Sequence, residues 1–323
     1  PEEVVVMNNL TVNLHLLLAS FYRPTGKRFK IIMEGGAFPS DMYVIESQVK
    51  HHGYEYSDAV VEINPREGEH ALRTEDIVAK INEVGEECAL VFFSGVQYYT
   101  GQAFNVKALT EAAHSVGAYA GFDCAHAAGN IKMELHDWDV DFAAWCTYKY
   151  MNSSPGGVSG VFVHEKHGNN PDIPRLAGWW GHKESERFQM KKGFIPEPGA
   201  AGWQLSNAPV LAMAAHKASL DMFDEVGMDA LVAKGKQLNT FLEQVLMDAQ
   251  AANDKIAFEI ITPGERGCQI SILTNENGKA LFDYLTERDV VVDWREPNVI
   301  RLAPVPMYNS FMDVWEFGEL LKG

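Results

Sequence analysis

The sequence predicts an α/β protein with a mostly parallel central sheet flanked by helices, followed by a smaller α+β part. Through the first half, apolar strand-like runs alternate with helical patterns, which is typical of repeated βαβ units. After residue 208 this alternation gives way to long helices and then to a second group of short strands. With 323 residues, the chain is long enough for two domains of about 150 residues each. We therefore expect a large α/β domain at residues 1–208 and a small α+β domain at residues 209–323.

The first half contains a regular series of short, β-branched apolar runs separated by amphipathic stretches. A strand, a polar turn and a helix follow one another at the start of the chain, where Asn9 or Thr11 is placed to cap the helix. Thr74 is expected to cap a later helix in the same way. The strands are expected at 4–6, 30–33, 60–64, 88–93, 118–122, 141–147 and, as a hairpin-like neighbour, 158–164, and the later helices at 42–51, 74–84 and 105–116.

The second half begins with an irregular stretch and continues with helices. Residues 175–203 contain three tryptophans among glycines and prolines, and a loop of that length in a compact domain usually has a function. A helical block starts near Ala208, and a second helix runs from Met228 to about Ala249. Strands are then expected in FEIIT, GCQISILT, VVVDW and NVIRLAP, and helices in KALFDYLTERD and FMDVWEFGELLK.

Charge and hydropathy exclude several classes of protein. The net charge of −17 repels a phosphate backbone, so we expect no nucleic-acid partner. No apolar run approaches 18 residues, so we expect no membrane span, and no secretory leader is recognisable. The prediction is a cytoplasmic protein. The cysteines show no C-x-x-C spacing and lie in apolar runs, so Cys88, Cys124, Cys146 and Cys268 are expected to be reduced core residues.

The segment GFDCAHAAGN, followed by TYKYMNSSPGG, indicates a pyridoxal phosphate (PLP) site. Asp123 ends an apolar run, His126 follows three residues later, and Lys149 stands between two tyrosines beyond the next strand. The pyridine nitrogen of PLP needs a fixed anion to stay protonated, and its aldehyde needs an amine for covalent attachment. Asp123 and Lys149 are the candidates for these two roles.

Other polar and aromatic positions allow both a functional and a structural interpretation. The helix start near Thr11 could hold a phosphate or be a simple cap. Phe38, in a strand-to-helix connection, could stack on a cofactor ring or fill the core. Ser94 could donate to a ligand or begin a turn. Arg301, inside an apolar strand, could form a structural ion pair or bind a substrate carboxylate.

The histidine pairs do not predict a metal site. His164 and His167 in HEKH are three residues apart after a strand, whereas H-E-x-x-H needs a spacing of four on a helix. His51 and His52 are adjacent and would point in different directions on a helix. We therefore expect no metal.

Several runs together are more specific than a general PLP pattern. They are AFPSDMYVIESQ, FSGVQYYTGQAFN, GFDCAHAAGN, WCTYKYMNSSPGG, HEKH, GWWGH, LSNAPVL and IRLAPVPMYNSF. In these runs, over essentially its whole length, the chain resembles kynureninase, a PLP-dependent family of the aspartate aminotransferase superfamily with fold type I. The chain lacks a match to the N-terminal segment of about a hundred residues that family members carry, which contributes a histidine to the substrate site.

The resemblance implies a role for each matching residue. Lys149 matches the lysine that holds the cofactor, and Asp123 matches the partner of the pyridine nitrogen. Phe38 matches the aromatic residue that stacks on the ring, and Arg301 the one that binds the substrate α-carboxylate. Apart from the resemblance, Tyr148 or Tyr99 could transfer protons or bind the phosphate, and the sequence does not separate these roles. The further cofactor positions are Leu10, Thr11, Asp41, Ser94, His126, Tyr148, Trp179 and Asn207, and preference for the 3-hydroxyl is implied at Ser206 and Asn207.

The implied activity is that of a hydrolase acting on a carbon–carbon bond. It would convert L-kynurenine or 3-hydroxykynurenine to anthranilate or 3-hydroxyanthranilate and L-alanine, in tryptophan catabolism and NAD biosynthesis. The resemblance also implies a homodimer. The alternatives are another fold type I enzyme, such as a cysteine desulfurase or an aminotransferase, and a truncated PLP-binding protein without activity. A desulfurase needs a mobile cysteine, and Cys268 lies in a strand-like run.

Overall fold

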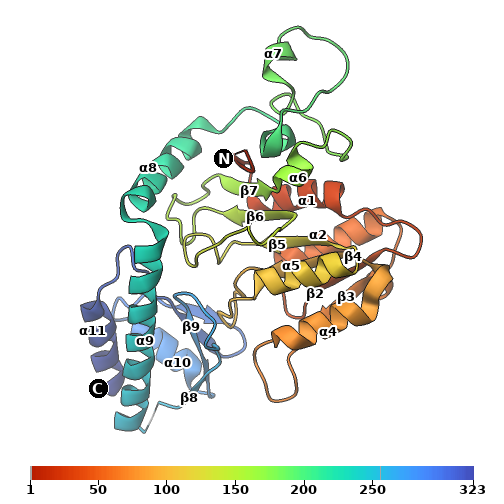
Figure 1. The fold of residues 1–323 in the computed structure, drawn as a ribbon. Coiled ribbons are helices and arrows are strands. Elements are labelled where there is room, and N and C mark those ends of the chain that lie inside the picture. Colours follow the sequence, from red (N-terminus) through yellow and green to blue (C-terminus); the bar gives the residue numbers. More distant parts are fainter. Residues whose placement is uncertain (1, 255) are drawn as a thin grey trace.

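The computed structural model describes residues 2–254 and 256–323 and is built around a seven-stranded sheet (Figure 1). The strand order is β1-β7-β6-β5-β4-β2-β3. Strand β7 pairs antiparallel with both β1 and β6, and the other neighbours pair parallel. The strands are β1 (Val4–Met7), β2 (Lys30–Glu34), β3 (Val60–Ile63), β4 (Cys88–Ser94), β5 (Tyr119–Asp123), β6 (Phe142–Cys146) and β7 (Ser159–Val163).

Helices cover both faces of this sheet, as the βαβ pattern predicts. Successive side chains of a strand point to opposite faces, so the fully buried Ile31 and Ile32 belong to different core clusters. One face packs against α1 (Leu10–Phe21), α2 (Pro39–His51), α3 (Tyr56–Ala59) and the 3₁₀ turn η2 (Gly199–Trp203), and the other against α4 (Thr74–Val84) and α5 (Val106–Ser115).

The strand directions bring several chain segments to one edge of the sheet. Strands β1, β2, β4, β5 and β6 all end at the same edge, where parallel sheets place ligands. At this edge the β4 and β5 loops approach closely, because a Cβ on Gly95 would lie 2.9 Å from the Cβ of Ala127. The reversed strand β7 ends at the opposite edge, beside the start of β1.

The C-terminal part has its own antiparallel sheet with the order β10-β11-β9-β8. Its strands are β8 (Phe258–Ile260), β9 (Ile270–Thr274), β10 (Asp293–Arg295) and β11 (Val299–Leu302). Helices α9 (Met228–Ala252), α10 (Gly278–Thr286) and α11 (Phe311–Lys322) form a common core with it. Helix α8 (Val210–Val226) leads from the first sheet to α9 (Figure 1).

The sequence expectations fail mainly at the ends of elements. Helix α2 begins at Pro39 instead of residue 42, since proline is favoured in the first helical turn. Thr74 is the first helical residue, and the N-cap, Arg73, makes no side-chain cap. Strand β10 begins only at Asp293, and the irregular stretch contains α7 (Glu184–Arg187) besides η2. Two short elements, η1 (Gly85–Glu87) and α6 (Glu165–Gly168), complete the chain.

Two expectations drawn from composition can be compared with the structure. All four cysteines are buried and unpaired, which confirms that they are core thiols. Across residues 2–254 and 256–323, none of the helices combines the length and the apolar character needed to cross a membrane.

Candidate active site

A cavity of about 450 Å³ lies at the carboxyl edge of the large sheet. Its walls come from the first turns of α1 and α2, from the ends of β4 and β5, and from the segment after β6. It is lined by Asn9, Leu10, Thr11, Phe38, Ser40, Asp41, Ser94, Val96, Tyr98, Asp123, Ala125, His126, Tyr148, Lys149 and Gly156. The cavity therefore brings together residues separated by up to about 150 positions in the chain.

One part of the cavity wall suits an anion. Helices α1 and α2 both present their N-termini to it, and the amides of a first helical turn have no partner within the helix. The N-cap of α1, Asn9, makes no side-chain cap. The hydroxyls of Thr11 and Ser40, one from each helix, lie 2.7 Å apart. Two helix N-termini with adjoining hydroxyls form the kind of site that binds phosphate.

A second part of the site is acidic and buried. Asp123 ends β5, is 5% exposed, and accepts a hydrogen bond of 2.7 Å from the amide of Ala125. Asp41, from the first turn of α2, and Glu34, from the end of β2, are each 3% exposed. Glu34 accepts a hydrogen bond from the Ser94 amide at 2.9 Å and another from the Ser94 hydroxyl. The Oε2 atom of Glu34 and the Oδ1 atom of Asp41 are buried without a hydrogen-bond partner.

Burial and mutual repulsion raise the pKa values of these three carboxyls. Burial raises the pKa of Glu34 to about 7, although its hydrogen bonds with Ser94 act in the opposite direction. Burial, together with the charge of Asp123, raises the pKa of Asp41 well above its usual range. Burial also raises the pKa of Asp123, while the Ala125 amide and the charge of Lys149 oppose the rise. A cluster of three buried carboxyls favours a ligand that brings a positive charge.

Lys149 supplies an amine beside these carboxyls. It follows β6, and its Nζ lies 5.6 Å from the centroid of the Phe38 ring. Phe38 is 41% exposed toward the cavity, so it is not a core plug. The turn after Lys149 has positive φ at Asn152, Ser154 and Gly156, where a glycine is least strained. The glycine-rich segment thus lets the chain turn back into β7 immediately after the lysine.

Two further rings line the site. Burial and the nearby charges of Lys149 and Arg301 lower the pKa of His126 well below its usual range, so the ring is neutral at pH 7. Its Nδ1 atom has no hydrogen-bond partner. Tyr98 stands edge-on to Phe38, with ring centroids 5.2 Å apart. A neutral imidazole with an unused nitrogen can accept or donate a hydrogen bond to a ligand.

Four residues that the resemblance assigns to the site lie outside the cavity wall. Trp179 is on the long loop, 40% exposed, with its ring against Phe188. Ser206 and Asn207 are on the connection to α8. Arg301, on β11, forms an ion pair with Asp293 and donates to the carbonyl of Tyr98 at 2.6 Å. Arg301 thus has a structural ion pair, and its contact with Tyr98, a residue of the cavity wall, puts it next to the cavity.

The sequence did not predict Glu34, Ser40 and Tyr98 as residues of the site. Glu34 was detectable as an acidic residue that ends an apolar strand just before two glycines. Ser40 was detectable inside the FPSD run. Tyr98 could not be distinguished from Tyr99 by pattern, yet Tyr98 lines the cavity, whereas the Tyr99 carbonyl accepts a hydrogen bond from the Ser271 hydroxyl.

The residues present fit PLP. The helix N-termini match its phosphate, the buried carboxyls match its protonated nitrogen, and Lys149 provides the amine for its aldehyde. The unpartnered buried Oδ1 atom of Asp41 supports this assignment, because an orphaned acceptor in a cavity wall indicates a ligand or an ion.

Comparisons with known proteins agree with this geometry. The model of the family "Aminotransferase class-V" matches residues 1–257, and "Kynureninase C-terminal domain" matches residues 231–321. Among solved structures, a C-DES mutant with glycine covalently linked to its PLP cofactor matches with a TM-score of 0.83 at 15% identity, over 100% of this chain and 81% of that one. A cysteine desulfurase from Thermococcus onnurineus has a TM-score of 0.77 at 16% identity, over 99% and 78%.

The fold and the site define a PLP-dependent enzyme of the class-V aminotransferase type, with fold type I. Curated kynureninases from Flavobacterium johnsoniae and Myxococcus xanthus are 59% and 50% identical to this chain, each over 100% of the chain and 76% of the relative. The chain belongs to the kynureninase family, whose members depend on PLP. The expectations of fold class, family and cofactor are confirmed.

Proposed function

We propose that this chain cleaves L-kynurenine, or its 3-hydroxy form, to anthranilate, or 3-hydroxyanthranilate, and L-alanine. The observation that carries the proposal is the identity of 59% to a kynureninase over the whole chain. The cavity supports it, because a lysine, an aspartate and two helix N-termini surround one space of about 450 Å³.

Bound PLP supplies an electron sink at the substrate Cα. Lys149 is the residue that would hold it covalently and then take the Cα proton at Nζ. Asp123 would keep a negative charge opposite the ring nitrogen, and Phe38 would flank the ring. Partial burial raises the pKa of Tyr148 to about 12, so its hydroxyl is protonated at neutral pH and can donate a hydrogen bond. The first turns of α1 and α2 would bind the phosphate through amides and hydroxyls.

The substrate residues are proposed on the resemblance. Arg301 would bind the α-carboxylate, and its contact with Tyr98 supports a place behind the substrate. Ser206 and Asn207 would set the preference for a 3-hydroxyl, and Trp179 and Asn207 would complete the cofactor site. Trp179, Ser206 and Asn207 lie on the long loop and its connection to α8. The loop also exposes Phe188 (75%), and the first turn of α8 exposes Leu211 (87%). Exposed apolar side chains of that size favour the proposed homodimer, with the loop contributing to the partner's site.

We also propose that the boundary between the two domains lies near residue 208, between η2 and α8. A cytoplasmic location stays a prediction.

A desulfurase is the nearest alternative activity. Its support is structural likeness to a cysteine desulfurase at 16% identity, which shows the fold alone. Cys268, the cysteine that lies beyond residue 208, is 2% exposed, and burial raises its pKa to about 12. A buried thiol of that kind is a poor nucleophile.

The test is the fluorescence of anthranilate after the PLP-loaded chain is mixed with L-kynurenine. We expect release by the parent chain, loss in Lys149→Ala, and no loss in the control Lys132→Ala, an exposed lysine. Sulfide release from cysteine without anthranilate release would favour the desulfurase. Cofactor uptake without either product would favour a non-catalytic PLP-binding protein.

A further inference from the structure

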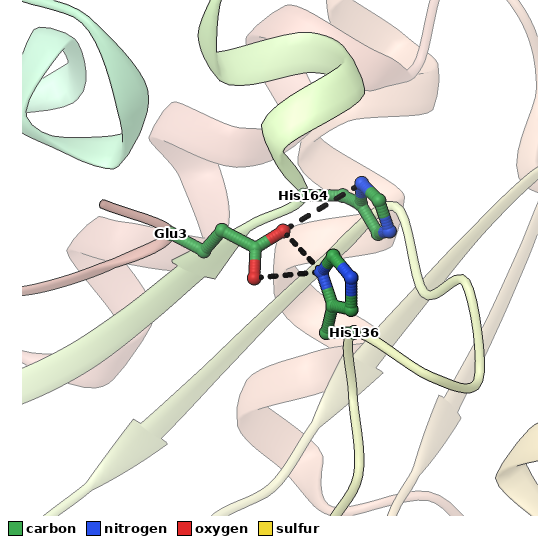
Figure 2. A group of neighbouring side chains, drawn as sticks. All are labelled: Glu3, His136 and His164. Carbon is green, nitrogen blue, oxygen red and sulfur yellow. Dashed lines mark hydrogen bonds and ion pairs between the residues drawn. The ribbon is translucent and has the colours of Figure 1, made fainter. Parts of the chain in front are cut away.

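A cluster of one carboxylate and two imidazoles lies at the edge of the large sheet opposite the active site (Figure 2). Glu3 is at the start of β1, His164 directly follows β7, and His136 is on the loop between β5 and β6. One possible ligand atom from each of the three residues lies within 4.8 Å of the other two. Figure 2 shows the carboxylate pointing between the two rings.

The spacing of these atoms is near that of ligands around one metal ion. Nδ1 of His136 is 3.0 Å from each oxygen of Glu3, and Nδ1 of His164 is 3.6 Å from Oε1. Bonds of about 2.0–2.1 Å to a tetrahedral ion put neighbouring ligand atoms about 3.3 Å apart. Two imidazoles and one carboxylate are a common ligand set for zinc.

The surroundings of His164 fix which of its nitrogens carries the lone pair. The backbone amide of Lys166 donates to Nδ1 at 3.2 Å, and Nε2 faces Oδ1 of Asp139 at 3.5 Å. Both contacts place the ring proton on Nε2 and the lone pair on Nδ1, where a metal ion would replace the Lys166 amide. Nδ1 and the Glu3 oxygen are then two acceptors that face each other. A cation between them would turn this repulsion into attraction.

The residues around Glu3 and His164 make contacts that orient the proposed ligand atoms. The carboxylate of Asp139 lies 3.5 Å from Nε2 of His164, on the side of the ring where carboxylates stand behind metal-bound imidazoles. The amide of Glu165 donates to Oε1 of Glu3 at 2.7 Å and leaves Oε2 with His136 alone. The ammonium group of Lys166 is near the cluster, but it is paired with Asp139 at 2.6 Å and with Asp141 at 3.2 Å.

We propose that Glu3, His136 and His164 bind a divalent transition-metal ion of the zinc class. The two rings lie almost parallel, at 13°, so the ring of His136 must turn before both Nδ1 atoms can reach one ion. Its side chain is 52% exposed and has room to do so. The ion would tie β1, the edge strand that leads into α1, to two loops of the sheet. The expectation of no metal rested on histidines at most three residues apart, whereas Glu3 and His136 are 133 residues apart and His136 and His164 are 28 residues apart.

The test is calorimetric titration of the PLP-loaded, EDTA-stripped chain with zinc chloride alone. We expect one zinc per chain, and binding weakened by at least about tenfold in His136→Ala and in Glu3→Gln. His136 lies on an exposed loop, so its removal leaves the fold intact, as far-UV circular dichroism and cofactor absorbance would verify. Asp139→Asn, at a φ of 56° that asparagine tolerates, should weaken binding by about tenfold through His164.

The matched control is His51→Ala, an exposed histidine outside the cluster, which should bind zinc as the parent does. Zinc should also raise the melting temperature of the parent and of His51→Ala, but not that of His136→Ala. A parent that takes up no stoichiometric zinc would overturn the proposal. So would His136→Ala and Glu3→Gln variants whose affinity stays within about threefold of the parent's.

Discussion

The buried carboxyl of Glu34 should make the cofactor-free chain less stable as the pH rises. Its pKa is raised from an ordinary value of 4.5 to about 7, chiefly by burial. An acid with a raised folded pKa binds more protons in the folded state, so stability falls between those two pH values and stays lower above them. A difference of this size corresponds to about 3 kcal/mol. Glu34→Gln cannot ionise, and its amide oxygen can still accept from Ser94.

Urea unfolding at pH 5 and pH 8 measures this effect. The stability of Glu34→Gln relative to the parent should increase by about 2–3 kcal/mol between the two pH values. Glu111→Gln, on the exposed face of α5, is the control and should show no such change. A difference between parent and Glu34→Gln that is equal at both pH values would mean that Glu34 ionises freely in the folded chain, and the reasoning would be wrong.

Three further substitutions test the site and the fold. Asp123→Asn keeps an acceptor for the Ala125 amide but loses the negative charge. That charge is worth about 4 kcal/mol opposite a cation at about 4 Å, so kcat/KM should fall by roughly 10³. A fall of less than about tenfold would contradict the proposed role of Asp123 as partner of the ring nitrogen. Phe38→Leu should weaken PLP binding by about 2–10-fold, measured by absorbance titration; unchanged affinity would argue against stacking. Burial acts to raise the pKa of Asp141, but hydrogen bonds from His114 and His167 outweigh it and lower that pKa. The stabilisation by Asp141 is therefore present above about pH 4 and is lost on acidification. Asp141→Asn should cost about 3–5 kcal/mol of stability at pH 7, measured by urea unfolding, and a cost below about 1 kcal/mol would refute this.

The strands and helices could be predicted because apolar residues recur clearly at the spacing of strands and helices. Each expected strand of the large sheet is present, and the antiparallel β6–β7 hairpin is confirmed. The ends were less predictable. Thr74 has the chemistry of a cap, but the backbone of Arg73 takes the N-cap position. Residues 290–292 are β-branched yet precede β10, since strand pairing starts only at Asp293.

The site residues that could be predicted are those whose side chain has one clear role in PLP chemistry. Asp123 and Lys149 follow from the chemistry that PLP needs, and the structure brings both to one cavity. Glu34 was not predicted, because its raised pKa depends on burial, which a sequence pattern does not show. Arg301 remained ambiguous for the same reason, since its ion pair with Asp293 depends on the register of β10 with β11. Contacts between distant segments decide such cases.

The most direct test of the account is to locate the lysine that holds the cofactor. The PLP-loaded chain is reduced with borohydride, digested and mapped by mass spectrometry. The account predicts one modified peptide, carrying the cofactor on Lys149, and no stoichiometric adduct in Lys149→Ala. A cofactor found on any other lysine, or an unmodified Lys149 in a chain that has bound PLP, would contradict it.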